Sequence, residues 1–153
     1  MDEFFMQQAI KEAKKAYELN EVPIGAIVSK EGKVIGAGYN QSINKSDPSG
    51  HAEINALRDA GEKIGNYRLV NCDLYVTLEP CIMCLGAIFH ARIRNLYFGA
   101  HDTKTGACGG HINLLNNKSL NHHCKVHAGL LESEAVQILK EFFRKKRKKT
   151  MNK

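Results

Sequence analysis

The sequence contains no apolar run that approaches the roughly 20 residues needed for a membrane-spanning helix. Its first residues, Met-Asp-Glu-Phe-Phe-Met, lack the basic start and apolar core of a secretory signal peptide. Cysteine is scarce and odd in number, at five, which argues against a closed disulfide framework and for a reducing compartment. These absences predict a cytoplasmic protein with no membrane partner.

Positive charge is concentrated at one end of the chain. Residues 144–149 and Lys153 supply seven of the 22 basic residues, and the other 15 stand against 16 acidic residues. A basic end of this kind suits a polyanion partner, whose phosphates it would contact in a salt-dependent way. A solvated tail that only aids solubility explains the same charges.

The length of 153 residues predicts one domain, residues 1–153, with a basic C-terminal helix and tail from about residue 133. Strands that alternate with helices indicate a layered α/β sheet. The residue pattern predicts helices at 3–19, 52–60, 82–91 and 133–147, and strands at 24–29, 34–40, 74–78, 94–99 and 126–130.

Two helices carry more specific expectations. Residues 82–91 are almost all apolar or small, which predicts a helix that is buried on every side. The C-terminal helix is amphipathic, and its inward face is expected to hold Val136, Leu139, Phe142 and Phe143.

A long segment rich in Gly, Asn and His follows the predicted strand at 94–99. It covers residues 101–125, and only residues 112–115 suggest a short helical turn. Loops of this length are usually functional or disordered. Because α/β proteins tend to place ligand contacts after strands, we expect this loop to contact a ligand.

The most specific pattern is His51-Ala-Glu53 followed by Pro80-Cys81-Ile-Met-Cys84. One imidazole and two thiolates are ligands that Zn²⁺ prefers, and three protein ligands leave one position open for water. Proline is typical of a helix start, and a helix N-terminus favours the thiolate form of cysteine. The pattern therefore predicts two helix N-termini that meet at one Zn²⁺ per subunit.

Glu53 is predicted to be the catalytic acid–base group rather than a metal ligand. Zinc lowers the pKa of bound water from 15.7 to about 7, so a nucleophile is available at neutral pH. A neighbouring carboxylate can take the water proton and pass it to a substrate. A lone Cys-x-x-Cys would favour a structural zinc or redox role, but a thioredoxin-like redox role would not need His51 or Glu53.

The remaining cysteines have no clear role in the sequence. Their positions permit a second metal site, although buried or loop cysteines beside a His-rich surface explain them more simply. The residues concerned are Cys72, Cys108, Cys124, His111, His122, His123 and His127.

These motifs resemble those of the bacterial tRNA-specific adenosine deaminases, within the cytidine-deaminase-like superfamily, whose zinc signature is well known. The similarity runs nearly from end to end. The Asp102–Gly106 loop and the Phe-Phe-Arg tail are the parts typical of the tRNA branch. The matching stretches are 20–28, 39–40, 47–48, 51–54, 77–87, 97–107 and 142–147.

The resemblance implies a three-layer α/β/α fold with a five-stranded mixed sheet flanked by helices, in a homodimer. It also implies hydrolytic deamination of adenosine to inosine at the wobble position of a tRNA anticodon loop, with an arginine isoacceptor as the tRNA. The anticodon bases are unpaired, so splaying one into a pocket costs little.

The resemblance also assigns contacts to the substrate. Asn40 and the backbone of Ala52 are expected to hold the base. Flanking nucleotides and phosphates are expected to contact Asp102, Lys104, Phe143 and Arg144. Two departures from the family pattern bear on the RNA contacts alone: Tyr39 replaces a frequent Trp, and His101 replaces an Arg of some relatives.

Two other functions stay open from the residues. One is a deaminase of free nucleobases or nucleosides such as guanine or cytidine, although a small ligand needs neither the basic tail nor the long loop. The other is a non-catalytic, zinc-stabilised RNA-binding module.

Overall fold

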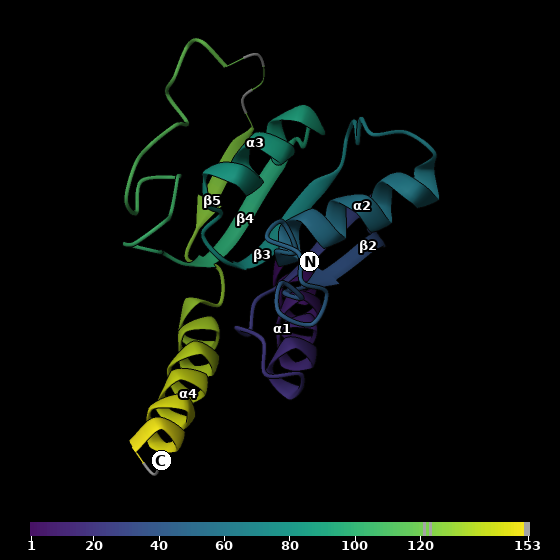
Figure 1. Cartoon of the computed structure of the whole chain (residues 1–153). Coiled ribbons are helices and arrows are strands. Elements are labelled where there is room, and N and C mark those ends of the chain that lie inside the picture. Colours follow the sequence, from purple (N-terminus) through teal and green to yellow (C-terminus); the bar gives the residue numbers. More distant parts are fainter. Residues whose placement is uncertain (121, 123, 152–153) are drawn as a thin grey trace.

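The computed structural model describes residues 1–120, 122 and 124–151. Its centre is a five-stranded sheet in the order β2-β1-β3-β4-β5 (Figure 1). β1 is antiparallel to β2 and β3, whereas β3, β4 and β5 are parallel, so the expected mixed sheet is confirmed. The strands are β1 (Gly25–Lys30), β2 (Lys33–Tyr39), β3 (Asp73–Leu78), β4 (Asn95–Ala100) and β5 (Lys125–Ala128).

Helices cover both faces of the sheet, which gives the expected three layers (Figure 1). Alternate strand residues point to opposite faces. Val28 and Leu74 belong to the core under α2 and α3, whereas Ile27 and Tyr75 pack against α1. The helices are α1 (Asp2–Glu18), α2 (Ala52–Ile64), α3 (Ile82–His90) and α4 (Glu132–Met151).

Local sequence explains where several elements begin and end. β1 and β2 are joined by Glu31 and Gly32, both with positive φ, as a two-residue hairpin turn requires. α2 continues four residues beyond the predicted end and stops at Gly65, which takes the left-handed conformation typical of a helix C-terminus. None of the described helices is long and apolar enough to cross a membrane.

The prediction that α3 is buried on every side is wrong. Ile82 and Met83 are 60% and 36% exposed. α3 lies in an outer layer, so the sheet covers only one of its sides, and part of its apolar outer side is exposed. The buried side consists of Cys84, Leu85, Ile88 and Phe89.

The predicted inward face of α4 is only partly correct. Phe142 is 4% exposed and packs its ring against Tyr17, but Phe143 is 42% exposed. The elements that contact α4 most are β3, β4 and α1, and they cover a narrow stripe of the helix. That stripe contains Ala135 and Phe142, with Ile138 packed against the core beside α1. Val136 and Leu139 are half-buried.

The long loop after β4 folds back onto the segment that begins α3. Gly106 forms an isolated bridge with Cys81, and the Ala107 N–H donates to the Pro80 carbonyl at 2.9 Å. The helical turn suggested at residues 112–115 does not form, because Asn113 instead bridges Cys108. The loop therefore lies against the candidate metal ligands.

Candidate metal and catalytic site

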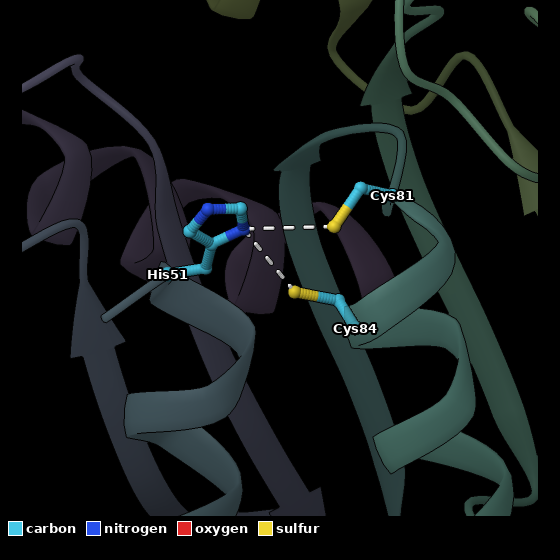
Figure 2. Close-up of side chains that lie close together, drawn as sticks. All are labelled: His51, Cys81 and Cys84. Carbon is cyan, nitrogen blue, oxygen red and sulfur yellow. Dashed lines mark hydrogen bonds between the residues drawn. The ribbon is translucent and has the colours of Figure 1, made fainter. Parts of the chain in front are cut away.

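Two helix N-termini meet at the carboxyl end of β3. His51 is the N-cap residue of α2 and Cys81 is the N-cap residue of α3, and both have extended backbone. Cys84 lies one turn into α3. Figure 2 shows the imidazole of His51 pointing across the gap between the two helices toward both sulfurs.

The distances suit a tetrahedral zinc ion. His51 Nδ1 lies 3.6 Å from Cys81 Sγ and 3.5 Å from Cys84 Sγ. Nitrogen at about 2.1 Å and sulfur at about 2.3 Å from Zn²⁺, at a tetrahedral angle, lie roughly 3.6 Å apart. All three ligand atoms lie within 4.8 Å of one another, and no other metal-ligand cluster occurs among the described residues.

Hydrogen bonds among His51, Cys81 and Cys84 shift the pKa values of all three side chains. Hydrogen bonds from Cys84 and then His51 lower the pKa of Cys81 to about 4. The same contact with Cys81, together with burial, raises the pKa of Cys84. The hydrogen bond with Cys81 also raises the pKa of His51. A divalent cation would replace the shared protons, so its binding releases protons to solvent.

Glu53 lies in the first turn of α2 and is 4% exposed. Burial raises the pKa of its carboxyl to about 7. A carboxyl with a pKa near neutrality can both accept and donate a proton, which is what a general acid–base group needs.

Glu53 shares a small cavity of about 60 Å³ with His51 and Cys81, whereas Cys84 is buried behind its lining. Five of the predicted site residues line it: Asn40, His51, Glu53, Cys81 and Asp102. Four further lining residues were given no role in the sequence analysis: Ile24, Leu78, Glu79 and Thr105. Leu78 and Glu79 stand directly before Pro80-Cys81, and that adjacency was the available signal for them.

Asn40 and Ala52 are joined by a hydrogen bond. The Ala52 N–H donates to Asn40 Oδ1 at 2.8 Å, and Ala52 itself is buried outside the cavity lining. The backbone N–H of Ala52 is therefore used to fix Asn40. With its oxygen engaged, Asn40 presents its NH₂ group as the donor for a ligand.

Asp102 lies at the cavity and also organises its own loop. Its Oδ1 accepts from the Lys104 N–H at 2.9 Å and the Thr105 N–H at 3.2 Å. Its Oδ2 accepts from the Thr105 hydroxyl at 2.9 Å. A carboxylate has about four acceptor positions, so these bonds leave capacity for one ligand contact.

Lys104 and Phe143 meet in a larger groove of about 750 Å³ between α4 and the end of the sheet. Leu78 lines both this groove and the small cavity, so the two are adjacent. Arg144 lies elsewhere, on the neighbouring face of α4. The groove combines apolar and basic side chains: Leu78, Ala100, His101, Lys104, Val136, Leu139, Lys140, Phe143, Lys146, Arg147, Thr150 and Met151.

A second metal site does not form among the described members of the His-rich segment. His122 Nε2 contacts the Ile93 carbonyl at 2.8 Å, and the His127 ring stacks on Tyr97. Cys124 is half-buried and has a free thiol. His123, which the sequence analysis included, lies outside the described residues.

Comparisons with known proteins agree with this geometry. Residues 1–147 match the MafB19-like deaminase family model. A curated relative from Haemophilus influenzae, named tRNA-specific adenosine deaminase, is 49% identical over 147 residues, which is 95% of this chain and 85% of that protein.

Two solved structures share the fold. One belongs to a study of A-to-I editing by tRNA:A34 deaminases at the wobble position of transfer RNA. It has a TM-score of 0.86 at 46% identity, over 89% of this chain and 99% of that chain. The other is a guanine deaminase from Nitrosomonas europaea, with a TM-score of 0.81 at 25% identity, over 93% and 84% of the two chains.

Proposed function

This chain belongs to the MafB19-like deaminase family, and from that premise we infer that it deaminates adenosine to inosine at the wobble position of a tRNA anticodon loop. The observation that carries this inference is a buried Glu53 in one cavity with His51 and Cys81, two members of a His-Cys-Cys cluster of zinc-like geometry. The near-full-length similarity to tRNA-specific adenosine deaminases selects the substrate.

His51, Cys81 and Cys84 are the residues that would hold Zn²⁺, which supplies an activated water at neutral pH when bound. Glu53 accepts a proton from the attacking water and delivers it to N1 of the adenine. It then carries the second water proton to the exocyclic amine, which leaves as ammonia. Its burial and raised pKa suit both transfers.

The target base is held by the NH₂ group of Asn40, which Ala52 fixes in place. Asp102 contacts the sugar or the neighbouring nucleotide from the opposite wall. The groove beside α4 receives flanking nucleotides, because the Phe143 ring offers a stacking surface and Lys104 a phosphate contact. Arg144 adds a further phosphate contact outside the groove.

We also propose that two copies pair through the outer sides of α2 and α3. Ile82 and Met83 are exposed there, beside a hollow of about 640 Å³ that Ile54 and Tyr67 help to line. Covering this apolar surface favours association. We further propose that residues 1–153 act as one cytoplasmic deaminase domain, with an arginine isoacceptor as the tRNA.

The experiment is to incubate the zinc-loaded protein with an anticodon stem-loop that carries a wobble adenosine, and to sequence the RNA for inosine. Inosine at that position alone is the expected result. Activity only on free guanine or cytidine would establish a deaminase of free nucleobases or nucleosides instead, and the Nitrosomonas europaea structure is described as a guanine deaminase. RNA binding without any ammonia release would establish the non-catalytic module.

A further inference from the structure

Glu79 is a third carboxylate at the candidate active site, besides Glu53 and Asp102. It is the residue between β3 and Pro80, two positions before the metal-ligand candidate Cys81. Its side chain is fully buried although it also borders the cavity that contains Glu53. A buried carboxylate is costly unless hydrogen bonds satisfy it, so its partners decide what it does.

Among the described residues, the hydrogen-bond partners of the Glu79 carboxylate belong to the loop of residues 101–110. Oε1 accepts from the Asp102 N–H at 3.1 Å and contacts His101 Nδ1 at 3.0 Å. Oε2 accepts from the Cys108 N–H at 2.8 Å and the Gly110 N–H at 2.9 Å. Each oxygen therefore has two partners, and three of the four are backbone N–H groups whose positions define the loop.

The glycines of the loop are explained by the same carboxylate. A Cβ added at Gly106 or at Gly110 would overlap the Glu79 carboxylate and the Asp102 carbonyl. Only a residue without a side chain lets the backbone approach this closely. The segment Gly106-Ala-Cys-Gly-Gly110 is thus shaped to wrap around one buried acid.

We propose that Glu79 is a positioning residue, which holds loop 101–110 in the shape that forms the substrate wall of the active site. Asp102 and Thr105 in this loop line the cavity, and the Ala107 N–H bonds to Pro80. Glu79 thereby sets the distance between the substrate wall and the metal ligands. The claim that this wall contacts a substrate rests on the proposed function. The hydrogen bonds that join Glu79 to the loop do not depend on it.

Glu53 and Glu79, two of the three carboxylates at the cavity, differ in role because their partners differ. Glu79 has both oxygens engaged by the loop and has no free acceptor position to exchange protons with a substrate. Glu53 is the one placed for proton transfer. Loss of Glu79 should therefore weaken the binding of substrate much more than it slows the chemical step.

The test is Glu79→Gln in the zinc-loaded protein. The amide keeps the size of the side chain but turns an NH₂ group toward two donors of the loop. We expect unchanged zinc content, faster hydrogen exchange at the amides of residues 102, 108 and 110, and a KM for the stem-loop raised about tenfold or more. kcat should fall less than about threefold. Glu18→Gln, on the exposed end of α1, is the matched control and should change none of these values.

Gly110→Ala provides a second test that keeps the acid but crowds both the Glu79 carboxylate and the Asp102 carbonyl, and so disturbs the packing of the loop around Glu79. It should reproduce the change in hydrogen exchange and in KM, and it decides the question if the Glu79 variant does not fold. Unchanged exchange and KM in the variants would overturn the proposal. A large fall in kcat with KM unchanged would also overturn it, because Glu79 would then act in proton transfer. Hydrogen exchange needs no substrate, so it tests the loop even if the protein proves inactive on RNA.

Discussion

His51 and Cys81 occupy equivalent places in two different helices. Each is an N-cap residue with extended backbone, at φ −79° and ψ 154° for His51 and φ −76° and ψ 175° for Cys81. Their ligand atoms lie 3.6 Å apart. Because Cys81 is at the positive end of a helix dipole and accepts hydrogen bonds from its neighbours, the site stabilises the Cys81 thiolate before any metal binds.

Removing either sulfur should abolish metal binding. Cys81→Ala or Cys84→Ala leaves two protein ligands, too few for a stable zinc site. We expect less than about a tenth of an equivalent of zinc by metal analysis, together with loss of deamination. Cys72→Ala is the control, because Cys72 is buried away from the cluster and its variant should retain one equivalent. Full zinc occupancy in the Cys84 variant would show that the cluster is not the metal site.

Removing the proton carrier should separate binding from chemistry. Glu53→Gln keeps the shape of the side chain but can no longer accept a proton. We expect unchanged zinc content and RNA affinity, with kcat lowered by about 10²–10⁴. The measurement is single-turnover inosine formation beside zinc analysis. Retention of full turnover would assign proton transfer to another group.

Substitution of two adjacent aromatic residues by alanine should affect two different properties, stability for Phe142 and RNA binding for Phe143. Phe142 is buried against Tyr17, so Phe142→Ala should lower the melting temperature and cost up to about 3–5 kcal/mol of stability. Phe143 is 42% exposed in the groove, so Phe143→Ala should leave stability unchanged and weaken RNA binding by about 1–3 kcal/mol. Calorimetry and RNA titration distinguish the two. Equal effects of the two variants on RNA binding would argue against a stacking role for Phe143.

This contrast illustrates what the sequence could predict. Periodicity identified α4 and its apolar residues, but it could not show that only one narrow stripe would meet the body. For the same reason α3 was expected to be buried all round, although a sheet covers only one side of it. Which apolar faces stay exposed depends on the neighbours that the tertiary fold provides, and on partners outside the chain.

The residues of the candidate site also differ in how well the sequence could predict them. His51, Cys81, Cys84 and Glu53 could be recognised because metal binding restricts residue type and spacing. The place of Glu79 directly before Pro80-Cys81 put it near the site, but its role could not be predicted, because its partners lie 22 to 31 residues along the chain and three of them are backbone groups. Hydrogen bonds to the backbone leave no pattern of residue types.

The basic groove should give RNA binding its salt dependence. Lys146→Gln with Arg147→Gln removes two of its cations. We expect weaker binding of the stem-loop, and a slope of log affinity against log salt reduced by about 0.7–0.9 for each phosphate that the protein no longer neutralises. Lys11→Gln with Lys14→Gln, on the exposed side of α1, is the control with equal charge change. Equal slopes for the two double variants would mean that the tail acts only through net charge.

The stability of the protein at acid pH should depend on Glu21. Its buried carboxylate accepts hydrogen bonds from Ile43 and Asn44, in the segment that leads to His51. Burial opposes its ionisation, but hydrogen bonds from Asn44 and from the Ile43 N–H outweigh burial and lower the pKa of Glu21. A depressed folded-state pKa gives stability that is fully present above the unfolded pKa of about 4.3 and is lost as the pH falls through the folded value.

Glu21→Gln should therefore be less stable than the wild type at pH 7, and should lose less further stability below about pH 4.3. Thermal unfolding at pH 7 and pH 3.5 measures both effects, with Glu18→Gln as the exposed control. Parallel loss of stability in the Glu21 variant and the wild type would contradict the assignment.

The central claim is that three protein side chains hold one zinc ion whose fourth position is open to water beside Glu53. X-ray absorption at the zinc edge of the loaded protein tests it most directly. We predict two sulfurs at about 2.3 Å, one nitrogen at about 2.0–2.1 Å and one oxygen at a similar distance. A shell made only of sulfur and nitrogen, with four protein ligands, would contradict the catalytic account.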